Sequence, residues 1–406
     1  MPASTPSSDG ADAPRIAWSE QGVVHEARWR SERGAPAPSR VVVADDRTAA
    51  DHAYGLAAQG TGLLWRGDFQ NARQLLSAMA SRLDRPARRA RGARSATPAS
   101  GDASGATPAE RFHRMRQARS QRARTLGMLL IPIDADYGVP LRRAPDLRLA
   151  CTEAWGAPDA SASVASLREL LGIVGAHEWR RKGVDVPALG ARIHPHYGVF
   201  APVRGEYVDL VARAALPDAR REHDVAFDLG TGTGVLAALL ARRGFARVIA
   251  TERSPRALAC ASDNLQRLDL DGRVELVSAD LYPEGRAALV VCNPPWVPAR
   301  PASPIEAGIY DEGSAMLKGF LRGLSAHLVP GGEGWLLLSD LAEHLGLRTR
   351  DELIAWIAEA GLVVAGRDDV RPSHPKASDD ADPLHAARAA EVTSLWRLVA
   401  RSARPA

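Results

Sequence analysis

The second half of the sequence predicts an α/β fold with a doubly wound, mostly parallel sheet of seven strands. Short apolar runs of strand length alternate there with amphipathic stretches of helix length, and each run is almost continuously apolar. Such strands are buried on both faces, as in a parallel sheet covered by helices on either side. The predicted strands are 225–229, 247–251, 273–277, 288–292, 334–339, 362–370 and 391–400. The predicted helices between them are 234–244, 254–268, 313–328 and 349–361.

The first half predicts a smaller α/β region over residues 15–185, preceded by a flexible tail over residues 1–14. Its helices are indicated by apolar side chains at helical spacing, such as Leu75, Leu76 and Met79. The predicted strands and helices are 40–46, 48–60, 67–83, 124–134 and 163–181. Tryptophans on apolar patterns throughout the chain are predicted to lie in the core: Trp65, Trp179, Trp335, Trp356 and Trp396.

An Arg-rich, low-complexity segment at about residues 85–110 interrupts the first half and predicts a disordered or loosely ordered linker. From Arg85 to Arg124, eleven arginines face only two acidic residues, whereas the net charge of the whole chain is +4. A concentrated basic segment is typical of contact with RNA or another polyanion. An ordinary solvated linker is the other interpretation, because only three lysines occur among the 52 basic residues of this Ala- and Gly-rich chain. Both interpretations stay open.

Composition and cysteine usage predict a cytoplasmic globular protein. Apolar residues make up 45% and charged residues 25% of the chain, and no apolar run approaches the ~18 residues that would span a bilayer. The N-terminus has no apolar core typical of a secretory signal. Three widely spaced cysteines argue against disulfides and against a zinc site. His194 and His196 lack a third ligand at suitable spacing, so no metal is expected.

A glycine-rich turn follows the first strand of the predicted sheet, in VAFDLGTGTGVLAALLA. Gly230, Gly232 and Gly234 stand between a strand and a helix, where glycine permits a tight turn and close approach of the backbone to a ligand. Asp228 precedes this turn, and Thr231 lies within it. An ordinary strand–helix turn is the alternative. Dinucleotide enzymes use the related spacing GxGxxG, which differs from the GxGxG found here.

Acidic residues end the next two strands. Glu252, followed by Arg253, closes the second strand and can accept hydrogen bonds from the hydroxyls of a ribose. Asp280, followed by Leu281, closes the third strand and can accept one from an adenine amino group. Each could equally be a solvated strand-end acid or a turn residue. Together with the glycine-rich turn after the first strand, these two acidic strand ends indicate a nucleoside-binding edge at three consecutive strands.

The fourth strand ends in the corner Asn293-Pro294-Pro295-Trp296, within LVVCNPPWVPARP. Prolines cannot extend a sheet, because they donate no N–H and fix φ. A rigid corner of this kind therefore serves something other than strand pairing. A strand-terminating turn with a packed tryptophan is the alternative.

The order of these motifs, one after each of four successive strands, resembles that of the class I S-adenosylmethionine-dependent methyltransferases. The Asn-Pro-Pro-Trp corner resembles the [DNS]-P-P-[YFW] motif of the amino-methylating branch, which includes HemK-type glutamine methyltransferases, adenine N6 enzymes and "methyltransferase small" guanine N2 enzymes. Residues 198–216 resemble the segment that precedes the glycine turn in this family. The resemblance implies a catalytic domain over residues 193–402. Trp296 departs from the commoner Tyr or Phe.

The resemblance implies roles for the marked residues. S-adenosylmethionine would be bound by Asp228, Gly230, Thr231, Gly232, Gly234, Glu252, Arg253, Asp280, Leu281 and Asn293. Asn293, Pro294, Pro295 and Trp296 would form the catalytic corner. A planar nitrogen has a delocalised lone pair and attacks poorly, so two acceptors, the Asn293 side chain and the Pro294 carbonyl, would turn that lone pair toward the methyl group. Trp296 would stack on the flat acceptor, worth ~1–3 kcal/mol for a base.

The interpretation is an N-methyltransferase acting on an exocyclic amino group of an RNA base, with rRNA as the expected RNA. The N-terminal region would recognise this macromolecular substrate. Three alternatives remain: a HemK-type methyltransferase for a protein glutamine, a catalytically inactive RNA-binding module with the same fold, and a nucleotide-dependent oxidoreductase. The GxGxG spacing and the Asn-Pro-Pro-Trp corner oppose the oxidoreductase.

Overall fold

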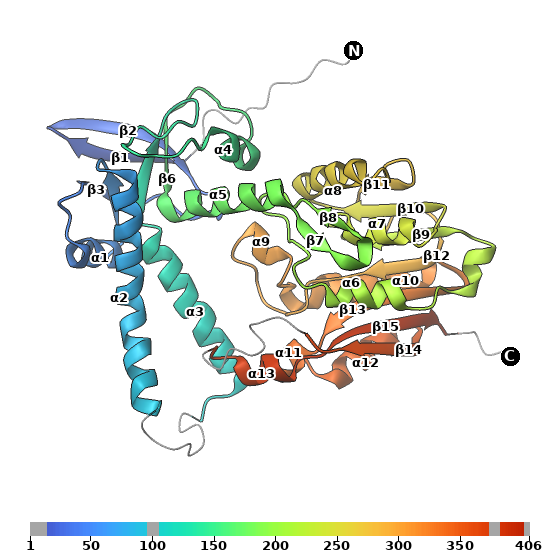
Figure 1. Ribbon diagram of the computed structural model, residues 1–406. Coiled ribbons are helices and arrows are strands. Elements are labelled where there is room, and N and C mark those ends of the chain that lie inside the picture. Colours follow the sequence, from blue (N-terminus) through green and yellow to red (C-terminus); the bar gives the residue numbers. More distant parts are fainter. Residues whose placement is uncertain (1–13, 96–104, 373–381, 402–406) are drawn as a thin grey trace, which may run out of the picture. The chain divides into compact units, whose positions relative to one another are not determined.

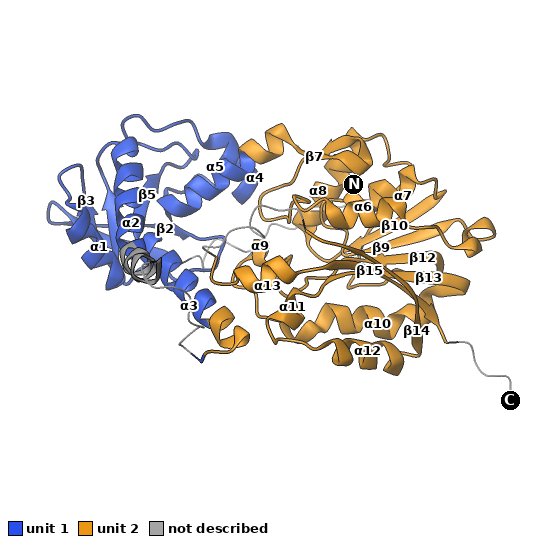
Figure 2. Ribbon diagram, turned by 60° about the horizontal axis from the view of Figure 1, so that its bottom comes forward, with its two compact units in different colours: residues 1–105, 114–177 blue, residues 106–113, 178–406 orange. Residues whose placement is uncertain are grey.

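The computed structural model describes residues 14–95, 105–372 and 382–401. Almost all of the expected tail over residues 1–14 therefore lies outside the described part. The chain divides into two compact units, the first with Met1–Gly105 and Arg114–His177, the second with Ala106–His113 and Glu178–Ala406 (Figure 2). The first unit ends at His177 and the second resumes at Glu178, which is earlier than the boundary that the sequence predicts after residue 185.

A seven-stranded sheet forms the centre of the second unit (Figure 1), and it confirms the expected fold class. The strand order is β11-β10-β9-β12-β13-β15-β14, and β15 alone runs antiparallel to the other six strands. The chain thus adds strands to one side of β9 and then crosses to the other side at β12. The bounds are β9 (Val225–Leu229), β10 (Arg247–Glu252), β11 (Val274–Ser278), β12 (Ala287–Cys292), β13 (Leu328–Ser339), β14 (Leu362–Val370) and β15 (Thr393–Ala400).

Helices cover both faces of this sheet, because its strands are apolar on both sides. Ala226 packs with the helices of one face, whereas its neighbours Phe227 and Leu229 pack with those of the other. The first face carries α6 (Glu206–Arg213), α7 (Val235–Arg242) and α8 (Pro255–Arg267). The second carries α10 (Ala315–His327) and α12 (Arg350–Glu359). The short elements of this unit are β7 (Val184–Val186), η1 (Pro187–Leu189), β8 (Ala191–Ile193), η2 (Asp218–Arg221), α9 (Pro304–Ala307), η3 (Glu312–Ser314), α11 (Leu341–His344) and α13 (His385–Ala390).

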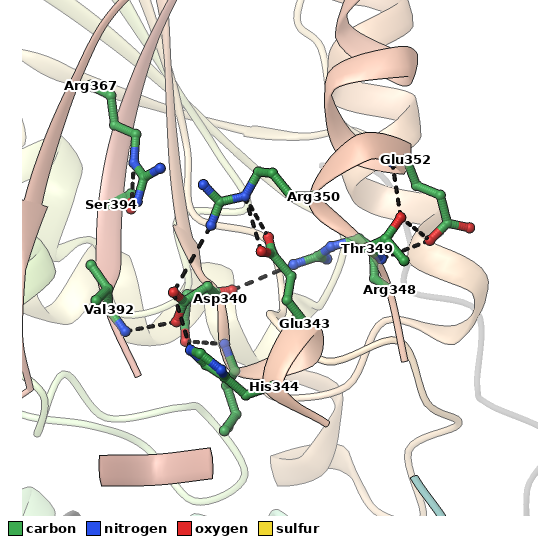
Figure 3. Close-up of polar contacts among 12 residues, drawn as sticks. Asp340, Glu343, His344, Arg348, Thr349, Arg350, Glu352, Arg367, Val392 and Ser394 are labelled. Carbon is green, nitrogen blue, oxygen red and sulfur yellow. Dashed lines mark hydrogen bonds and ion pairs between the residues drawn. The ribbon is translucent and has the colours of Figure 1, made fainter. Parts of the chain in front are cut away.

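A polar cluster ties the carboxyl end of β13 to the start of β15 (Figure 3). Asp340 accepts a hydrogen bond of 2.7 Å from the backbone N–H of Val392, and its other oxygen lies 3.4 Å from His344 Nε2. Arg350 donates 2.9 Å to Glu343 Oε1. Because Arg350 opens α12, the cluster fixes this helix against the strand end.

A six-stranded mixed sheet forms the first unit, with the order β1-β2-β6-β5-β4-β3. Arg66, just after β4, pairs with Glu20 at the end of β1 at 2.6 Å, so the sheet curls. The strands are β1 (Arg15–Glu20), β2 (Val23–Arg30), β3 (Arg40–Ala44), β4 (Thr61–Trp65), β5 (Leu129–Ile133) and β6 (Ser163–Ser166). Its helices are α1 (Ala50–Ala58), α2 (Phe69–Ser95), α3 (Pro108–Leu126), α4 (Arg148–Trp155) and α5 (Leu167–Lys182), with α3 and α5 crossing the division between the units.

Three sequence-based expectations for the first half are wrong. The Arg-rich segment is helical over most of its described residues, because α2 continues to Ser95 and α3 begins at Pro108. Ala and Arg are strong helix formers, so a missing apolar period does not prevent a helix. Its residues 96–104 lie outside the described part. The predicted helix 163–181 begins with strand β6, and Trp179 is half exposed, at 50%, and not in the core.

Candidate active site

The carboxyl ends of three neighbouring strands meet at one edge of the second sheet. Leu229 of β9 pairs in register with Thr251 of β10 and with Cys292 of β12. The residues that follow, Gly230, Glu252 and Asn293, therefore stand side by side on adjacent strands, ~4.8 Å apart per strand step. In a doubly wound sheet, ligands bind at this edge, where the chain reverses its direction of strand addition.

The glycine turn between β9 and α7 requires glycine for its backbone conformation. Gly230, Gly232 and Gly234 have φ angles of 72°, 55° and 82°. A Cβ on Gly230 would lie 2.6 Å from the Cε atom of Met316, whereas a Cβ on Gly232 would meet only a backbone oxygen at 4.0 Å. The space over Gly232 is thus open to a ligand.

Asp228 holds this turn from beneath. Its Oδ2 atom accepts 2.7 Å from the Thr231 hydroxyl and 3.0 Å from the Ala237 backbone N–H. Its Oδ1 atom is buried and has no hydrogen-bond partner among the described residues. Burial, together with the nearby charge of Glu252, raises the pKa of Asp228 to about 6.

Glu252 is bound to the backbone of two turns. Its Oε1 atom accepts from the N–H groups of Arg253 and Ser254, at 2.8 Å and 2.9 Å. Its Oε2 atom accepts from Gly232 at 3.3 Å. The carboxylate is therefore fixed in the edge that the sequence predicts for a nucleoside.

Arg253, Asp280 and Leu281 flank the same edge. The side chains of Arg253 and Asp280 are 82% and 81% exposed, and their charged groups are 4.0 Å apart. Leu281 has a φ of 75°, and its carbonyl oxygen accepts from the Thr251 hydroxyl. The structure thus places Arg253 and Asp280 at the exposed rim of this edge, whereas Leu281 is partly buried.

The Asn-Pro-Pro-Trp corner is more enclosed than its sequence suggests. Pro294 is buried, whereas Asn293, Pro295 and Trp296 are partly buried. The Nε1 atom of Trp296 donates a hydrogen bond of 2.8 Å to Oδ1 of Asn293. The loop then pairs through Val297, whose N–H donates 3.2 Å to the carbonyl of Ile309. The corner is therefore held from both of its ends.

Sequence reasoning missed two residues that contact Trp296. The guanidinium carbon of Arg204 lies 4.9 Å from the centre of the indole ring, and the Tyr207 ring meets it edge-on at 6.4 Å. Both come from the segment around the start of α6, far from the corner in sequence. No local pattern marks Arg204, so only the tertiary structure reveals it.

The histidines of IHPHYG have protein partners. His194 Nδ1 lies 2.6 Å from the carbonyl oxygen of Arg180, and His196 Nε2 lies 2.8 Å from Asp263. Across residues 14–95, 105–372 and 382–401, no three His, Cys, Asp or Glu side chains gather as metal ligands would. Within the same ranges, every helix is too short or too polar to cross a bilayer.

Comparison with known proteins identifies the family. The family model of the methyltransferase small domain matches residues 190–344. A tRNA1(Val) (adenine(37)-N6)-methyltransferase of Shewanella amazonensis is 30% identical over 172 residues, which are 39% of this chain and 72% of that protein. The chain belongs to the methyltransferase small family. Its sheet order and glycine turn are those of a class I, Rossmann-like methyltransferase fold.

Two further matches to this methyltransferase small protein are a curated relative and a solved structure. A release factor glutamine methyltransferase of Cereibacter sphaeroides is 39% identical over 120 residues, covering 26% of this chain and 43% of that protein. The chain thus spans less than half the length of that relative. A solved methyltransferase structure from Pyrococcus furiosus is 19% identical, covers 57% of this chain and 98% of its own, and has a TM-score of 0.38.

Proposed function

We propose that this protein is an S-adenosylmethionine-dependent N-methyltransferase whose acceptor is a planar nitrogen. One observation carries the proposal: Leu229 and Cys292 pair in register, so Gly230 and Asn293 are neighbours on adjacent parallel strands. The glycine turn expected to hold the donor therefore adjoins the corner expected to hold the acceptor. Methyl transfer needs the reacting atoms ~3–3.5 Å apart, which adjacent strand ends can provide.

The residues at this edge fit S-adenosylmethionine. The unpartnered Oδ1 atom of Asp228 and the open space over Gly232 suit a ligand with N–H donors close to the backbone. The methionine part would be held by Asp228, Gly230, Thr231, Gly232 and Gly234. The ribose would bind Glu252 beside Arg253, and the adenine would bind Asp280 and Leu281. When bound, the cofactor supplies a methyl group on a sulfonium leaving group.

The corner residues would bind and orient the acceptor. Asn293 Oδ1 and the carbonyl oxygen of Pro294 would each accept one N–H of the planar nitrogen, which favours the positive charge that develops on it. Pro295 keeps the turn rigid, so little conformational freedom is lost on binding. No metal would be needed, because the thioether is a good leaving group. No strong general base would be needed either, because the methylated nitrogen is cationic and acidic and would lose its extra proton to water.

An RNA base, with rRNA the expected source, is the acceptor that the charge distribution favours. Helix α3 carries six arginines and one acidic residue, and Arg114, Arg119 and Arg124 are exposed. In this proposal the first unit recognises the substrate. A protein glutamine is the second candidate, since one relative is named for a tRNA adenine and another for a release factor glutamine.

A cytoplasmic location belongs to the proposal, supported by three cysteines that are all free and buried.

Transfer of a labelled methyl group tests the proposal. The purified protein would be incubated with methyl-labelled S-adenosylmethionine and either RNA-depleted or protein-depleted cell extract. Label in the protein-depleted extract alone supports an RNA acceptor, and label in the RNA-depleted extract alone supports a protein acceptor. Label in neither extract, with cofactor binding intact by calorimetry, would refute the enzyme and leave an inactive module. Stabilisation by a nicotinamide cofactor alone would favour an oxidoreductase.

A further inference from the structure

Three side chains fix the indole ring of Trp296. Its Nε1 atom donates to Asn293 Oδ1 at 2.8 Å, and Arg204 lies over the ring with its Cζ atom 4.9 Å from the ring centre. The ring of Tyr207 meets it at an interplanar angle of 88°. Cation–π and edge-to-face contacts of this kind orient an aromatic ring. The protein itself therefore sets the position of Trp296.

Arg204 is anchored in turn by two buried carboxylates. It donates 2.6 Å to Glu206, at the start of α6, and 3.0 Å to Glu391, just before β15. Glu206 and Glu391 are 8% and 3% exposed. The Ser339 hydroxyl donates 2.6 Å to the same oxygen of Glu391. A buried carboxylate that loses its charged partner is strongly destabilised, so the guanidinium over Trp296 has little freedom to move.

The chemistry of the indole decides how Asn293 is oriented. An indole nitrogen can donate a hydrogen bond but cannot accept one, whereas a carboxamide has an accepting oxygen and a donating NH₂ group. Only the orientation with Oδ1 toward Trp296 is therefore compatible with this contact. The oxygen keeps a second lone pair for an N–H of the acceptor. In the opposite orientation, the Asn293 NH₂ group would face that N–H and repel it.

We propose that Trp296 is a positioning residue that acts through Asn293, by holding its carboxamide in the orientation that accepts an N–H from the substrate. Arg204 holds the ring in place. This inference rests on the proposed function, since it assigns a use to the free lone pair of Asn293. A phenylalanine would fill the same space without the N–H, so the variant Trp296→Phe isolates this role.

A double-mutant cycle, measured as kcat, tests the role of Trp296 in catalysis. Trp296→Phe should lower kcat about fivefold, as expected for one lost hydrogen bond, with an unchanged KM for S-adenosylmethionine. In the Asn293→Asp background the same change should alter kcat less than about twofold, because either carboxylate oxygen can accept. An equal loss in both backgrounds would overturn the inference.

The contact can be measured without activity. The indole N–H signal of Trp296 is assigned in nitrogen-15 NMR spectra by its absence from Trp296→Phe. Asn293→Ala should remove its protection from hydrogen exchange, and Asn293→Asp should preserve it. Protection that survives in Asn293→Ala overturns the inference even where the wild-type protein transfers methyl groups. A wild-type protein that has the protected N–H and transfers nothing refutes the proposed function instead.

Trp335 provides a matched control. It is fully buried on β13, and its Nε1 atom donates 2.9 Å to Glu333. Trp335→Phe removes the same group at a place with no expected contact to substrate. It should lower the Tm and leave kcat unchanged. If it lowers kcat as much as Trp296→Phe does, the loss reflects general destabilisation and the inference fails.

Discussion

The backbone N–H of Gly232 lies 3.3 Å from Oε2 of Glu252, so the turn after β9 and the acid that ends β10 are directly bonded. Glu252 also accepts from Arg253 and Ser254 through its other oxygen. A carboxylate offers about four acceptor sites, and three are already in use. Ribose hydroxyls would therefore bind the remaining site or replace the long contact to Gly232.

Glu252→Gln should weaken the binding of S-adenosylhomocysteine by roughly 10- to 100-fold, the usual worth of hydrogen bonds to a charged group. The amide cannot accept through both of its terminal atoms, so one backbone contact is lost together with the charge. Calorimetry measures the affinity. Glu275→Gln, on the exposed edge strand β11, is the control and should bind normally. Equal affinity in Glu252→Gln would contradict the assigned ribose contact.

Gly230→Ala should weaken cofactor binding and destabilise the protein. An alanine at a φ of 72° is strained by about 1–2 kcal/mol, and its Cβ would displace Met316 at the cofactor edge. Gly361, with a φ of 69° and no neighbour within 4 Å, is the matched control. Gly361→Ala should lower the Tm comparably and keep the affinity. Loss of affinity in both variants would mean that strain alone, and not the location of Gly230, is responsible.

The free energy of unfolding should depend on pH through Asp228. Its pKa is raised from an ordinary 3.8 to about 6, so the folded state holds its proton more tightly than the unfolded state does. The stabilisation is complete below pH ~4 and is lost as the pH rises through ~6, by about 3 kcal/mol for a shift of this size. Denaturant unfolding of Asp228→Asn should lack this part of the slope. If the free energy of unfolding depends on pH in the same way in the variant and the wild type, the raised pKa of Asp228 is excluded.

Asn293→Ala should lower methyl transfer roughly 10²- to 10³-fold, as the loss of one oriented acceptor does in other enzymes. Binding of S-adenosylhomocysteine should stay nearly intact, because the role assigned to Asn293 in transfer concerns the acceptor. Single-turnover rates and calorimetry separate these two effects. A collapse of cofactor affinity would move Asn293 to the cofactor side of the site.

Replacing Arg114, Arg119 and Arg124 by Gln should weaken RNA binding and flatten its dependence on salt. Each lost phosphate contact lowers the slope of log K against log salt by about 0.7 for single strands, so three would lower it by about two. These arginines are exposed on α3, so they can be substituted while the helix stays intact, whereas a deletion would remove part of the helix. The control replaces three exposed arginines elsewhere, Arg213, Arg221 and Arg267. An unchanged slope would make α3 an ordinary solvated helix.

The strands of the catalytic half could be predicted closely because their signal is local. Residues 225–229 and 362–370 match β9 and β14 residue for residue, since apolar runs between glycines and helix caps need no distant partner to be recognised. The expected strand at 334–339 was too short, because β13 begins at Leu328. A proline and two glycines, Pro330 to Gly332, interrupt the apolar pattern of its first half, and Leu328 and Glu333 pair with the neighbouring strand β12, a contact that no local pattern contains.

The first unit was harder to predict. Strand β1 carries Arg15, Ser19 and Glu20 among its apolar residues, and β4 is only five residues long, of which three are large and apolar. Both gain their stability from neighbouring strands in the six-stranded sheet. Trp179 lies on an apolar pattern, yet α5 leaves it half exposed. Periodicity cannot say which side of a helix another element will cover.

The sequence by itself determined the order of strands and helices in the second half and the residues at each strand end, because these depend on neighbours in the chain. The tertiary structure alone decided what surrounds Trp296. Arg204 and Glu391 are 187 residues apart and meet at 3.0 Å only because β15 inserts beside β13 and brings the start of that strand to α6. Contacts of that kind follow from packing, and a pattern along the chain does not contain them.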